Sequence, residues 1–271
     1  MISHPAGGYI SFGEPNSTRY QGLTRILPKD NTWDLCKTIE SIDIGAPADS
    51  LVLGIDTAER ISSRAVERFT VTNGATLYEV HMPRGEVKIT LDMRFIHDFS
   101  TENRRYELLD VTGGQVILYH CPAYSFALAI IGGKGKFIQN WKERDYAYDK
   151  QRGTQSNFWV CETLLIPVEH SLSLRFGVGW TPAAALADAN NNSPAAFNLV
   201  AGRYATSARA AGKVGSALDR LRSLYEKSPT IDLLETIAAL ESDPAARHGL
   251  LLTHLREHPT MAAAQALLAS H

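Results

Sequence analysis

Carboxylates and aromatic side chains gather in one stretch of the sequence, residues 141–153, which reads WKERDYAYDKQRG. Hydrolysis of a glycosidic bond needs two carboxylates that flank the bond, and Glu143, Asp145 and Asp149 are candidates for such a pair. Basic residues alternate with these acids, and that pattern is typical of a solvated loop or helix turn. We therefore predict no catalytic residue here and interpret the carboxylates as surface groups.

The aromatic residues of this stretch suggest binding. Trp141, Tyr146 and Tyr148 carry flat apolar faces of the kind that stack on sugar rings. Aromatic residues at the edge of a sheet also serve as packing, and that alternative stays open. We take Trp141 and Tyr146 as candidate substrate-binding residues.

A second group of charged residues lies within residues 86–94, where apolar and polar residues alternate as they do in a strand. Val87, Ile89, Leu91 and Met93 share the face expected to be buried, and Asp92 and Arg94 share the other face. A charged pair on the open face of a sheet is usually a solvated ion pair worth about 0–1 kcal/mol. We predict that interpretation for Asp92 and Arg94.

Composition excludes several classes of function. The chain has 271 residues and a formal net charge of -2, which is too balanced for the field that attracts nucleic acid. Its three cysteines are widely spaced, and no HExxH, GxSxG, GxGxxG or GxxxxGK[ST] motif occurs. We expect no metal and no cofactor. Without an apolar leader or an 18-residue apolar run, we expect a cytoplasmic protein that does not contact membranes.

Short runs rich in Val, Ile, Thr, Tyr and Phe predict strands in the first part of the chain, separated by Gly, Pro, Asn and Asp. No amphipathic helix intervenes, which favours an antiparallel sandwich over a parallel sheet. Asn73-Gly74 is the strongest hairpin signal. The predicted strands are residues 66–72, 76–81, 86–93, 115–120 and 126–131.

The pattern changes near Trp180: residues 1–180 hold ten alanines and residues 181–271 hold twenty-two. Thr181-Pro182 resembles an N-cap followed by an N1 proline and predicts a helix over residues 182–190. Helical spacing then predicts one long helix, kinked at its glycines, over residues 195–227. Later helices are expected to start at Ser228-Pro229, Asp243-Pro244 and His258-Pro259. We predict a fold that is mainly β followed by α, with domains 1–180 and 181–271.

Residues 7–11 read GGYIS and residues 16–23 read NSTRYQGL, and the segments 77–80, 87–98 and 140–153 follow them. These motifs, in this order, resemble the opening of glycogen debranching enzymes of the bacterial and archaeal amylo-α-1,6-glucosidase type. In that family a GGY-S segment leads through Asn and Thr/Arg into Arg-Tyr-His-Gly-Leu, followed by a strand pair and a charged aromatic loop. The resemblance covers about residues 7–180 and implies the N-terminal β-supersandwich of the family, with its catalytic part elsewhere.

Two departures from the family matter. Gln21 stands where the family usually has His, so amide groups replace an imidazole. The family's sandwich is followed by connecting helices and an (α/α)₆ barrel that supplies the catalytic acid and base, whereas about 90 helical residues follow here. The resemblance therefore implies a chain that is not active alone. Either the helices match the family's connecting segment, with the barrel lost or on a helical-barrel glycosidase partner chain, or they are an unrelated helical tail.

The resemblance also directs attention to the segment Arg19-Tyr20-Gln21 as a site for an α-glucan or oligosaccharide. The arginine donates in a fixed fork, the tyrosine offers a ring face, and the glutamine can pair with vicinal hydroxyls. The alternative is that Arg19 and Tyr20 only anchor the first strand.

For the whole protein we expect a non-catalytic carbohydrate-associated domain. The alternatives are a protein-interaction module with a helical docking tail and a complete but divergent glycoside hydrolase.

Overall fold

The computed structural model describes residues 1–12, 17–29, 32–98, 104–144, 146–153, 158–193, 197–210, 212–227, 229–260, 262 and 265. The chain forms two compact units, Met1–Ala195 and Ala196–His271.

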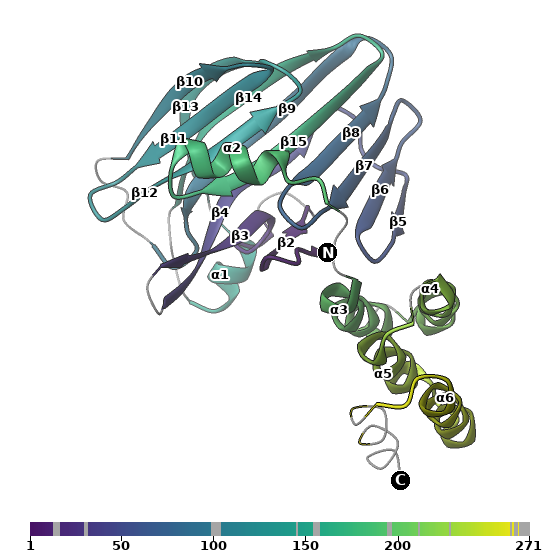
Figure 1. Ribbon diagram of the computed structural model, residues 1–271. Coiled ribbons are helices and arrows are strands. Elements are labelled where there is room, and N and C mark those ends of the chain that lie inside the picture. The colour runs from purple at the N-terminus through teal and green to yellow at the C-terminus, as the bar shows by residue number, and fades with distance from the viewer. Residues whose placement is uncertain are drawn as a thin grey trace. The chain divides into compact units, whose positions relative to one another are not determined.

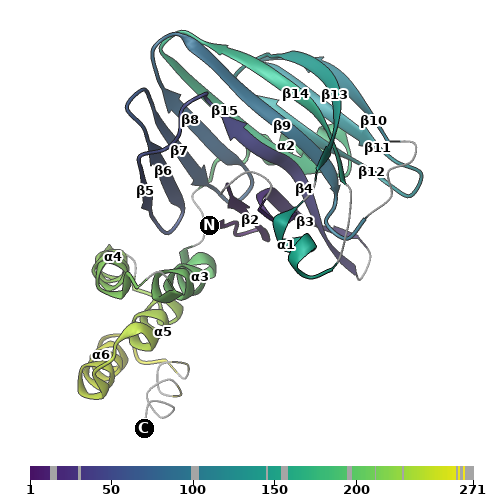
Figure 2. The ribbon, with the colours of Figure 1, turned by 180° about the vertical axis from the view of Figure 1, so that it is seen from behind.

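The first unit is a sandwich of two antiparallel sheets (Figure 1; Figure 2 shows it from behind). In spatial order, the seven-stranded sheet contains β1 (Ile2–Ser3), β2 (Gly8–Ser11), β3 (Gly22–Lys29), β4 (Thr32–Asp43), β9 (Gly85–Phe95), β14 (Phe158–Val168) and β13 (Lys136–Arg144). The eight-stranded sheet contains β10 (Arg105–Val111), β11 (Gly114–His120), β12 (Ser125–Ile131), β15 (Ser171–Gly179), β8 (Thr76–His81), β7 (Val66–Val71), β6 (Thr57–Ile61) and β5 (Ser50–Leu53).

This architecture confirms the predicted antiparallel sandwich followed by helices. The five predicted runs are β7, β8, β9, β11 and β12, and no end differs from the prediction by more than two residues. Asn73 and Gly74 lie in the hairpin between β7 and β8, which Thr72 closes by donating its N–H to the Ala75 carbonyl at 2.9 Å.

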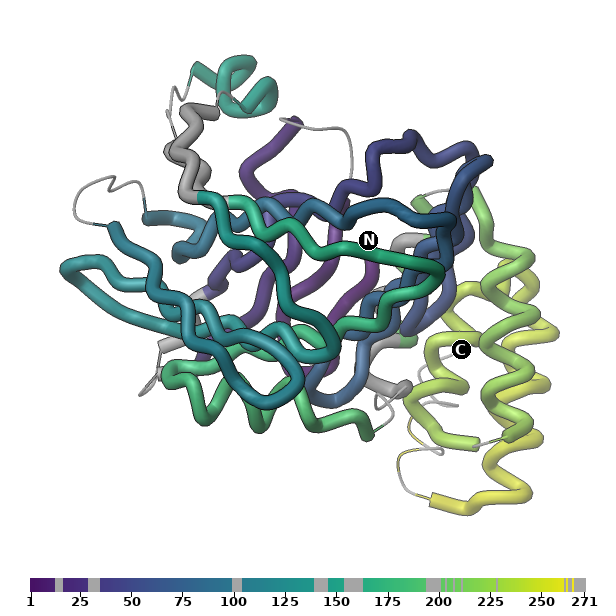
Figure 3. Tube along the Cα trace, turned by 90° about the horizontal axis from the view of Figure 1, so that it is seen from above, coloured from purple at the N-terminus to yellow at the C-terminus, as the bar shows by residue number. Residues whose placement is uncertain are grey.

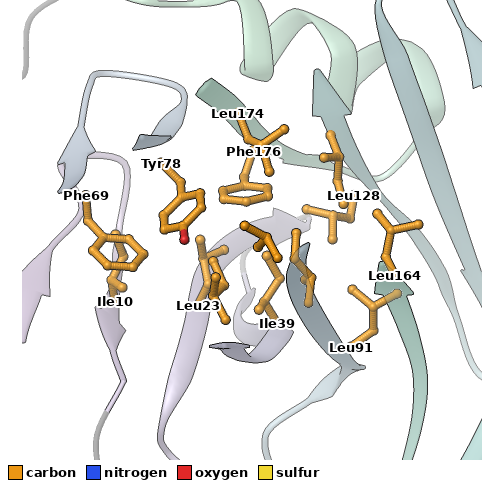
Figure 4. Close-up of a cluster of buried hydrophobic side chains, with 14 of the residues drawn as sticks. Ile10, Leu23, Ile39, Phe69, Tyr78, Leu91, Leu128, Leu164, Leu174 and Phe176 are labelled. Carbon is orange, nitrogen blue, oxygen red and sulfur yellow. The ribbon is translucent and has the colours of Figure 1, made fainter. Parts of the chain in front are cut away.

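The core lies between the two sheets (Figure 4). One layer comes from the seven-stranded sheet and the other from the eight-stranded sheet, and each fully buried aliphatic or aromatic side chain contributes about 1.5–3 kcal/mol to stability. The labelled members are Ile10, Leu23, Ile39, Leu91 and Leu164 facing Phe69, Tyr78, Leu128, Leu174 and Phe176.

Helix α2 (Pro182–Asn190) begins where the sequence predicts and packs on the outer face of the eight-stranded sheet, over β15, β12 and β11 (Figure 3, in green beside the teal strands). Thr181 caps it by accepting the Ala184 N–H at 3.2 Å, and Pro182 fits the first turn because that turn needs no donor there. The helix approaches β15 closely because Gly177 has no Cβ: an added Cβ would lie 2.2 Å from the Ala189 nitrogen. α2 therefore belongs to the first unit.

Arg25 of β3 holds α2 to the sandwich. Its Nη2 donates to both carboxylate oxygens of Asp188 at 3.0 and 3.1 Å, and its Nη1 donates to the Gly74 carbonyl and contacts the ring of His4. Burial, and then the charge of Arg25, lower the pKa of His4 to about 3, so the ring is neutral at pH 7, and its Nδ1 accepts the Ala6 N–H at 3.1 Å.

The second unit consists of four described helices, α3 (Phe197–Ala210), α4 (Val214–Lys227), α5 (Ile231–Leu240) and α6 (Pro244–Glu257). The single kinked helix predicted over residues 195–227 is wrong. Gly212 adopts φ +67°, and the Lys213 N–H donates to the Ala208 carbonyl at 2.8 Å, a glycine-terminated helix end that stops α3. Thr230 and Asp243 cap α5 and α6, and the start expected after Pro259 lies largely outside the described residues.

Candidate functional site

The turn that leads into β3 carries three of the predicted site residues. The phenol of Tyr9 donates to the Tyr20 carbonyl at 2.8 Å, and the Gln21 N–H donates to the Thr18 carbonyl at 3.2 Å. Gly22 has φ +113°, and an added Cβ would lie 2.1 Å from the Ile39 carbonyl, so this position requires glycine. These contacts hold Arg19 and Tyr20 in half-buried positions and direct Gln21 inward.

Gln21 is 3% exposed and joins a buried polar network. Its Nε2 donates to Glu40 Oε1 at 2.8 Å, and its Oε1 accepts the hydroxyl of Ser17 at 3.0 Å. Tyr146, also buried, donates its hydroxyl to Glu40 Oε2 at 3.3 Å, and Lys37 forms an ion pair with the same carboxylate. The structure thus brings together Gln21 and Tyr146, which are 125 residues apart in sequence, on one carboxylate.

The network continues through Asp92. Its carboxylate accepts two hydrogen bonds from Arg94 Nε, both at 3.0 Å, and lies 3.4 Å from Lys37 Nζ. Asp92, Arg94, Lys37 and Glu40 are all 0% exposed. The predicted solvated pair is therefore wrong, because β9 is a central strand that is buried on both faces at this point.

The charges of this network are matched internally. Burial by itself raises the pKa of Asp92, but Arg94 and Lys37 outweigh burial and hold the pKa below its ordinary value. Burial likewise lowers the pKa of Arg94, and Asp92 more than reverses that, so the guanidinium stays charged. Two buried carboxylates are thus neutralised by two buried cations.

Helix α1 (Ala147–Gln151) joins the network to the surface. The Tyr148 N–H donates to the Ser17 carbonyl at 3.0 Å, which ties α1 to the turn before β3. Asp149 is buried and lies 3.9 Å from Arg19 Nε, while the Arg19 carbonyl accepts from Lys37 at 3.1 Å. Asp149 was predicted to be a surface group, and the structure corrects that prediction because Asp149 faces the turn and not the solvent.

Two tyrosines, each with an arginine over its ring, lie at the surface above the network. Arg19 lies 5.1 Å from the ring centroid of Tyr20 and donates to its hydroxyl at 3.1 Å. Tyr148 is 39% exposed, and Arg152 lies 5.0 Å from its ring centroid. We call Arg19, Tyr20, Tyr148 and Arg152 the aromatic surface. The side chain of Trp141, another predicted member, lies outside the described residues; its backbone pairs with Cys161 in the sheet.

This arrangement determines the chemistry that the site can perform. Glu40 and Asp92 have no exposed surface, so they cannot act on a substrate in this conformation. Glu143 and Asp145 lie where the structure describes no side chain. The aromatic surface offers ring faces and guanidinium donors, which suit the apolar faces and hydroxyls of a sugar.

Sequence reasoning missed Lys37 and Glu40. Both belong to β4, whose pairing with β9 shifts register between Lys37 and Ile39 and again between Ile39 and Ser41. These irregularities place the two side chains, three residues apart, in contact, which a regular strand would not do. An alternating pattern therefore gave no signal for them.

Among the residues that the structure describes, no group of three or more His, Cys, Asp or Glu side chains is arranged to hold a metal ion. In that same part of the chain, no helix combines the length and the apolar character needed to cross a membrane.

No protein-family model matches the chain, and no curated protein matches it in sequence. Among solved structures, a bacterial glucoamylase complexed with acarbose is similar to it, with a TM-score of 0.37 and 10% sequence identity. The match covers 70% of this chain and 36% of the glucoamylase. The chain therefore spans well under two thirds of that enzyme's length.

Proposed function

We propose that the chain is a non-catalytic, carbohydrate-associated protein that binds α-glucan on the aromatic surface. The observation that carries this proposal is the layered construction of the site. Tyr148 is exposed and Tyr20 is half-buried, each has an arginine over its ring, and both lie beside a charge network that is closed to solvent. A rigid base of this kind keeps the ring faces in place before a ligand arrives, which lowers the entropic cost of binding.

The predicted binding residues take different parts in this proposal. Arg19 and Tyr20 contact the glucan directly, through guanidinium donors and a ring face. Gln21 and Tyr146 are buried and act as supports, because both bond to Glu40 beneath the surface. Tyr148 joins the contacting set because its ring is exposed and its backbone is tied to Ser17.

We further propose that the chain is related to the N-terminal part of glycogen debranching enzymes and assists a helical-barrel glycosidase on a separate chain. The sequence motifs at residues 7–11 and 16–23 support this relation. In the described part of these segments, residues 8–11 form β2, residues 17–21 form the turn that carries Arg19, Tyr20 and Gln21, and residues 22–23 begin β3. The segments that resemble the family are therefore the ones that build the proposed site.

Co-sedimentation with insoluble amylose tests the binding proposal, with cellulose as the control polymer. We expect the full chain to sediment with amylose and to stay in solution with cellulose. A chain that binds neither polymer would contradict the glucan proposal and favour a protein-interaction module.

An assay of reducing-sugar release tests the non-catalytic part of the proposal. We expect release from α-1,4- and α-1,6-linked glucans at the level of the blank, because the described carboxylates of the site are buried and paired. Release above the blank that Glu143→Gln abolishes would show that the chain is a complete glycoside hydrolase.

A further inference from the structure

Strand β5 ends the eight-stranded sheet, and no described strand pairs with its outer side (Figure 1). On its inner side β5 bonds to β6, where the Gly54 N–H donates to the Thr57 carbonyl at 2.7 Å. Because inward and outward groups alternate along an antiparallel ladder, the N–H and C=O groups of Leu51 and Leu53 point away from β6. β5 therefore presents two donors and two acceptors to a further strand.

The other edge strands of the two sheets have features that hinder pairing with a further strand. β1 has only two residues, and β10 and β13 carry charged side chains, with the sequences RYELLDV and KFIQNWKER. β5 reads SLVL, without a charge or a proline. Proteins usually protect their sheet edges with very short or charged strands. β5 is short but otherwise unprotected, so among the described edges it is the one best suited to strand pairing.

The side chains of β5 add an apolar surface to this edge. Leu51 is 51% exposed and Val52 is 46% exposed, on opposite faces of the strand. Leu51 and Leu53 lie on the inner face, where they line a hollow of about 50 Å³ together with Met1, which is also exposed, and Phe12. Val52 lies on the outer face. Exposed apolar side chains beside free backbone groups are typical of a strand that an assembly covers.

We propose that β5 pairs antiparallel with β5 of a second copy of this chain, across a two-fold axis at Val52. In that register Leu51 faces Leu53 of the second copy in both directions, and these residues exchange about four backbone hydrogen bonds. The two Val52 side chains then lie side by side on the outer face, at the position where cross-strand side chains are closest. This dimer goes beyond the proposed glucan binding and does not depend on it.

A second copy suits this edge because the edge is complementary to itself. The outward donors and acceptors of Leu51 and Leu53 match one another in the antiparallel register. Asp49, the charged residue nearest to the axis in sequence, lies opposite Ile55 of the second copy, so like charges do not face each other. The formal net charge of -2 adds little repulsion between copies. The leucines of the second copy project from the same face as Leu53, beside the hollow.

Sedimentation velocity of the full chain over a range of concentrations tests the dimer. We expect a Kd of roughly 10–300 µM, because a four-residue strand gives an interface at the small end of the known range. Val52→Lys should raise the Kd at least about fivefold, since two like charges replace an apolar pair. Val66→Lys is the matched control: Val66 is 41% exposed on β7, inside the sheet, so this variant should dimerise as the wild type does.

Two results of this experiment would overturn the proposal. One is a wild type that stays monomeric at about 0.5 mM, above the expected Kd. The other is a dimer that Val52→Lys leaves as stable as in the wild type, because the interface would then lie elsewhere on the chain.

Leu51→Pro and Leu51→Ala separate strand pairing from a simple apolar contact. Both variants lose the leucine side chain, but only proline also lacks the N–H that bonds to the second copy. The two-fold axis doubles this loss, so Leu51→Pro should dimerise at least about tenfold more weakly than Leu51→Ala. Both are first shown to be folded by their melting temperatures. Equal weakening in two folded variants would contradict strand pairing.

Val52→Cys tests the register and does not depend on a proline variant. The closest positions of an antiparallel pair bring two Cβ atoms within the range that a disulfide spans. Oxidised glutathione should therefore link Val52→Cys into a covalent dimer at concentrations where the wild type dimerises, and should leave the control Val66→Cys monomeric on a non-reducing gel. Equal yields of covalent dimer from the two variants, or none from Val52→Cys, would overturn the proposed pairing.

Discussion

Asp92 is the residue on which the buried network depends most, because it faces two cations and no water. Replacing it with asparagine leaves Lys37 and Arg94 buried with reduced compensation. We expect Asp92→Asn to lower the free energy of unfolding by about 3–5 kcal/mol, the usual result of breaking a buried ion pair on one side. Urea denaturation of the full chain measures this change.

The control for Asp92→Asn is an ion pair at the surface. Glu59 lies 3.7 Å from Arg68, and their side chains are 34% and 52% exposed. Glu59→Gln should change the free energy of unfolding by less than about 1 kcal/mol. If Asp92→Asn were as mild as Glu59→Gln, the network would not contribute the electrostatic stability that its burial implies.

His4 gives the protein a specific response to acid. Its pKa is about 3 in the folded chain and 6.5 in the unfolded chain, so the unfolded state binds one more proton between these values. The part of the free energy of unfolding that depends on neutral His4 is fully present above pH 6.5. It is lost as the pH falls toward 3, by roughly 1.4 kcal/mol per pH unit. We expect His4→Gln, which removes the titrating ring and keeps a polar side chain, to lose stability less steeply over this range.

Chemical denaturation at several pH values compares the two curves, with His81→Gln as the control because His81 is exposed on β8. Parallel curves for wild type and His4→Gln would contradict the account of His4 as a buried neutral imidazole.

At the residue scale, the sequence indicates Arg19, Tyr20, Gln21 and Tyr146 as candidates because of their donors and ring faces. The structure places these residues close together around one network, and their binding of a glucan stays a prediction. The burial of Asp92 was not predictable, because strand alternation assumes a sheet with one solvated face, whereas the turn and α1 cover that face here.

At the element scale, the close packing of α2 on β15 depends on Gly177, because glycine has no Cβ. An added Cβ would lie 2.2 Å from the Ala189 nitrogen and 2.4 Å from the Ala185 carbonyl, so the helix would have to move. We expect Gly177→Ala to lower the free energy of unfolding by about 1–3 kcal/mol, as overpacking does. Thermal and urea unfolding measure the loss.

Gly249 is the matched control for Gly177. It lies inside α6, and an added Cβ would meet nothing within 4 Å. Gly249→Ala should therefore stabilise the chain by about 0.5–1 kcal/mol, because alanine is the better helix former. A gain in stability for both variants would show that α2 does not pack closely on β15.

The strands were predictable because turn residues separate runs of β-branched and aromatic residues, and five such runs are strands in the structure. The helix break at Gly212 was harder to predict. Three glycines lie between residues 195 and 227, and the pattern alone does not show that only Gly212 among them adopts a positive φ. The positive φ of Gly212 is therefore what divides the predicted single helix into α3 and α4.

At the scale of the whole molecule, the structure assigns residues 182–190 to the sandwich. α2 covers an apolar patch on the outer face of the eight-stranded sheet that includes Val116, Ala127, Ala129 and Ile131. We expect a fragment of residues 1–195 to unfold cooperatively, and a fragment of residues 1–180 to melt at a lower temperature or aggregate, because that patch is exposed. Circular dichroism during heating compares the two fragments, and equal melting temperatures would show that α2 contributes no stability.

The central claim is that the aromatic surface binds α-glucan, and calorimetric titration with maltooligosaccharides tests it most directly. The variants are Arg19→Ala, Tyr20→Ala and the control Tyr20→Phe, each first shown to be folded by its melting temperature. Arg19→Ala keeps the carbonyl that accepts from Lys37 but removes the ion pair with Asp149, so its melting temperature is compared with that of the wild type first.

We predict millimolar or tighter binding by the wild type, similar binding by Tyr20→Phe, and weaker binding by Tyr20→Ala because the ring face is lost. Arg19→Ala should bind roughly 10- to 150-fold more weakly, the effect of losing a charged hydrogen bond. No heat of binding from the wild type at millimolar sugar, or wild-type affinity in both alanine variants, would contradict the claim.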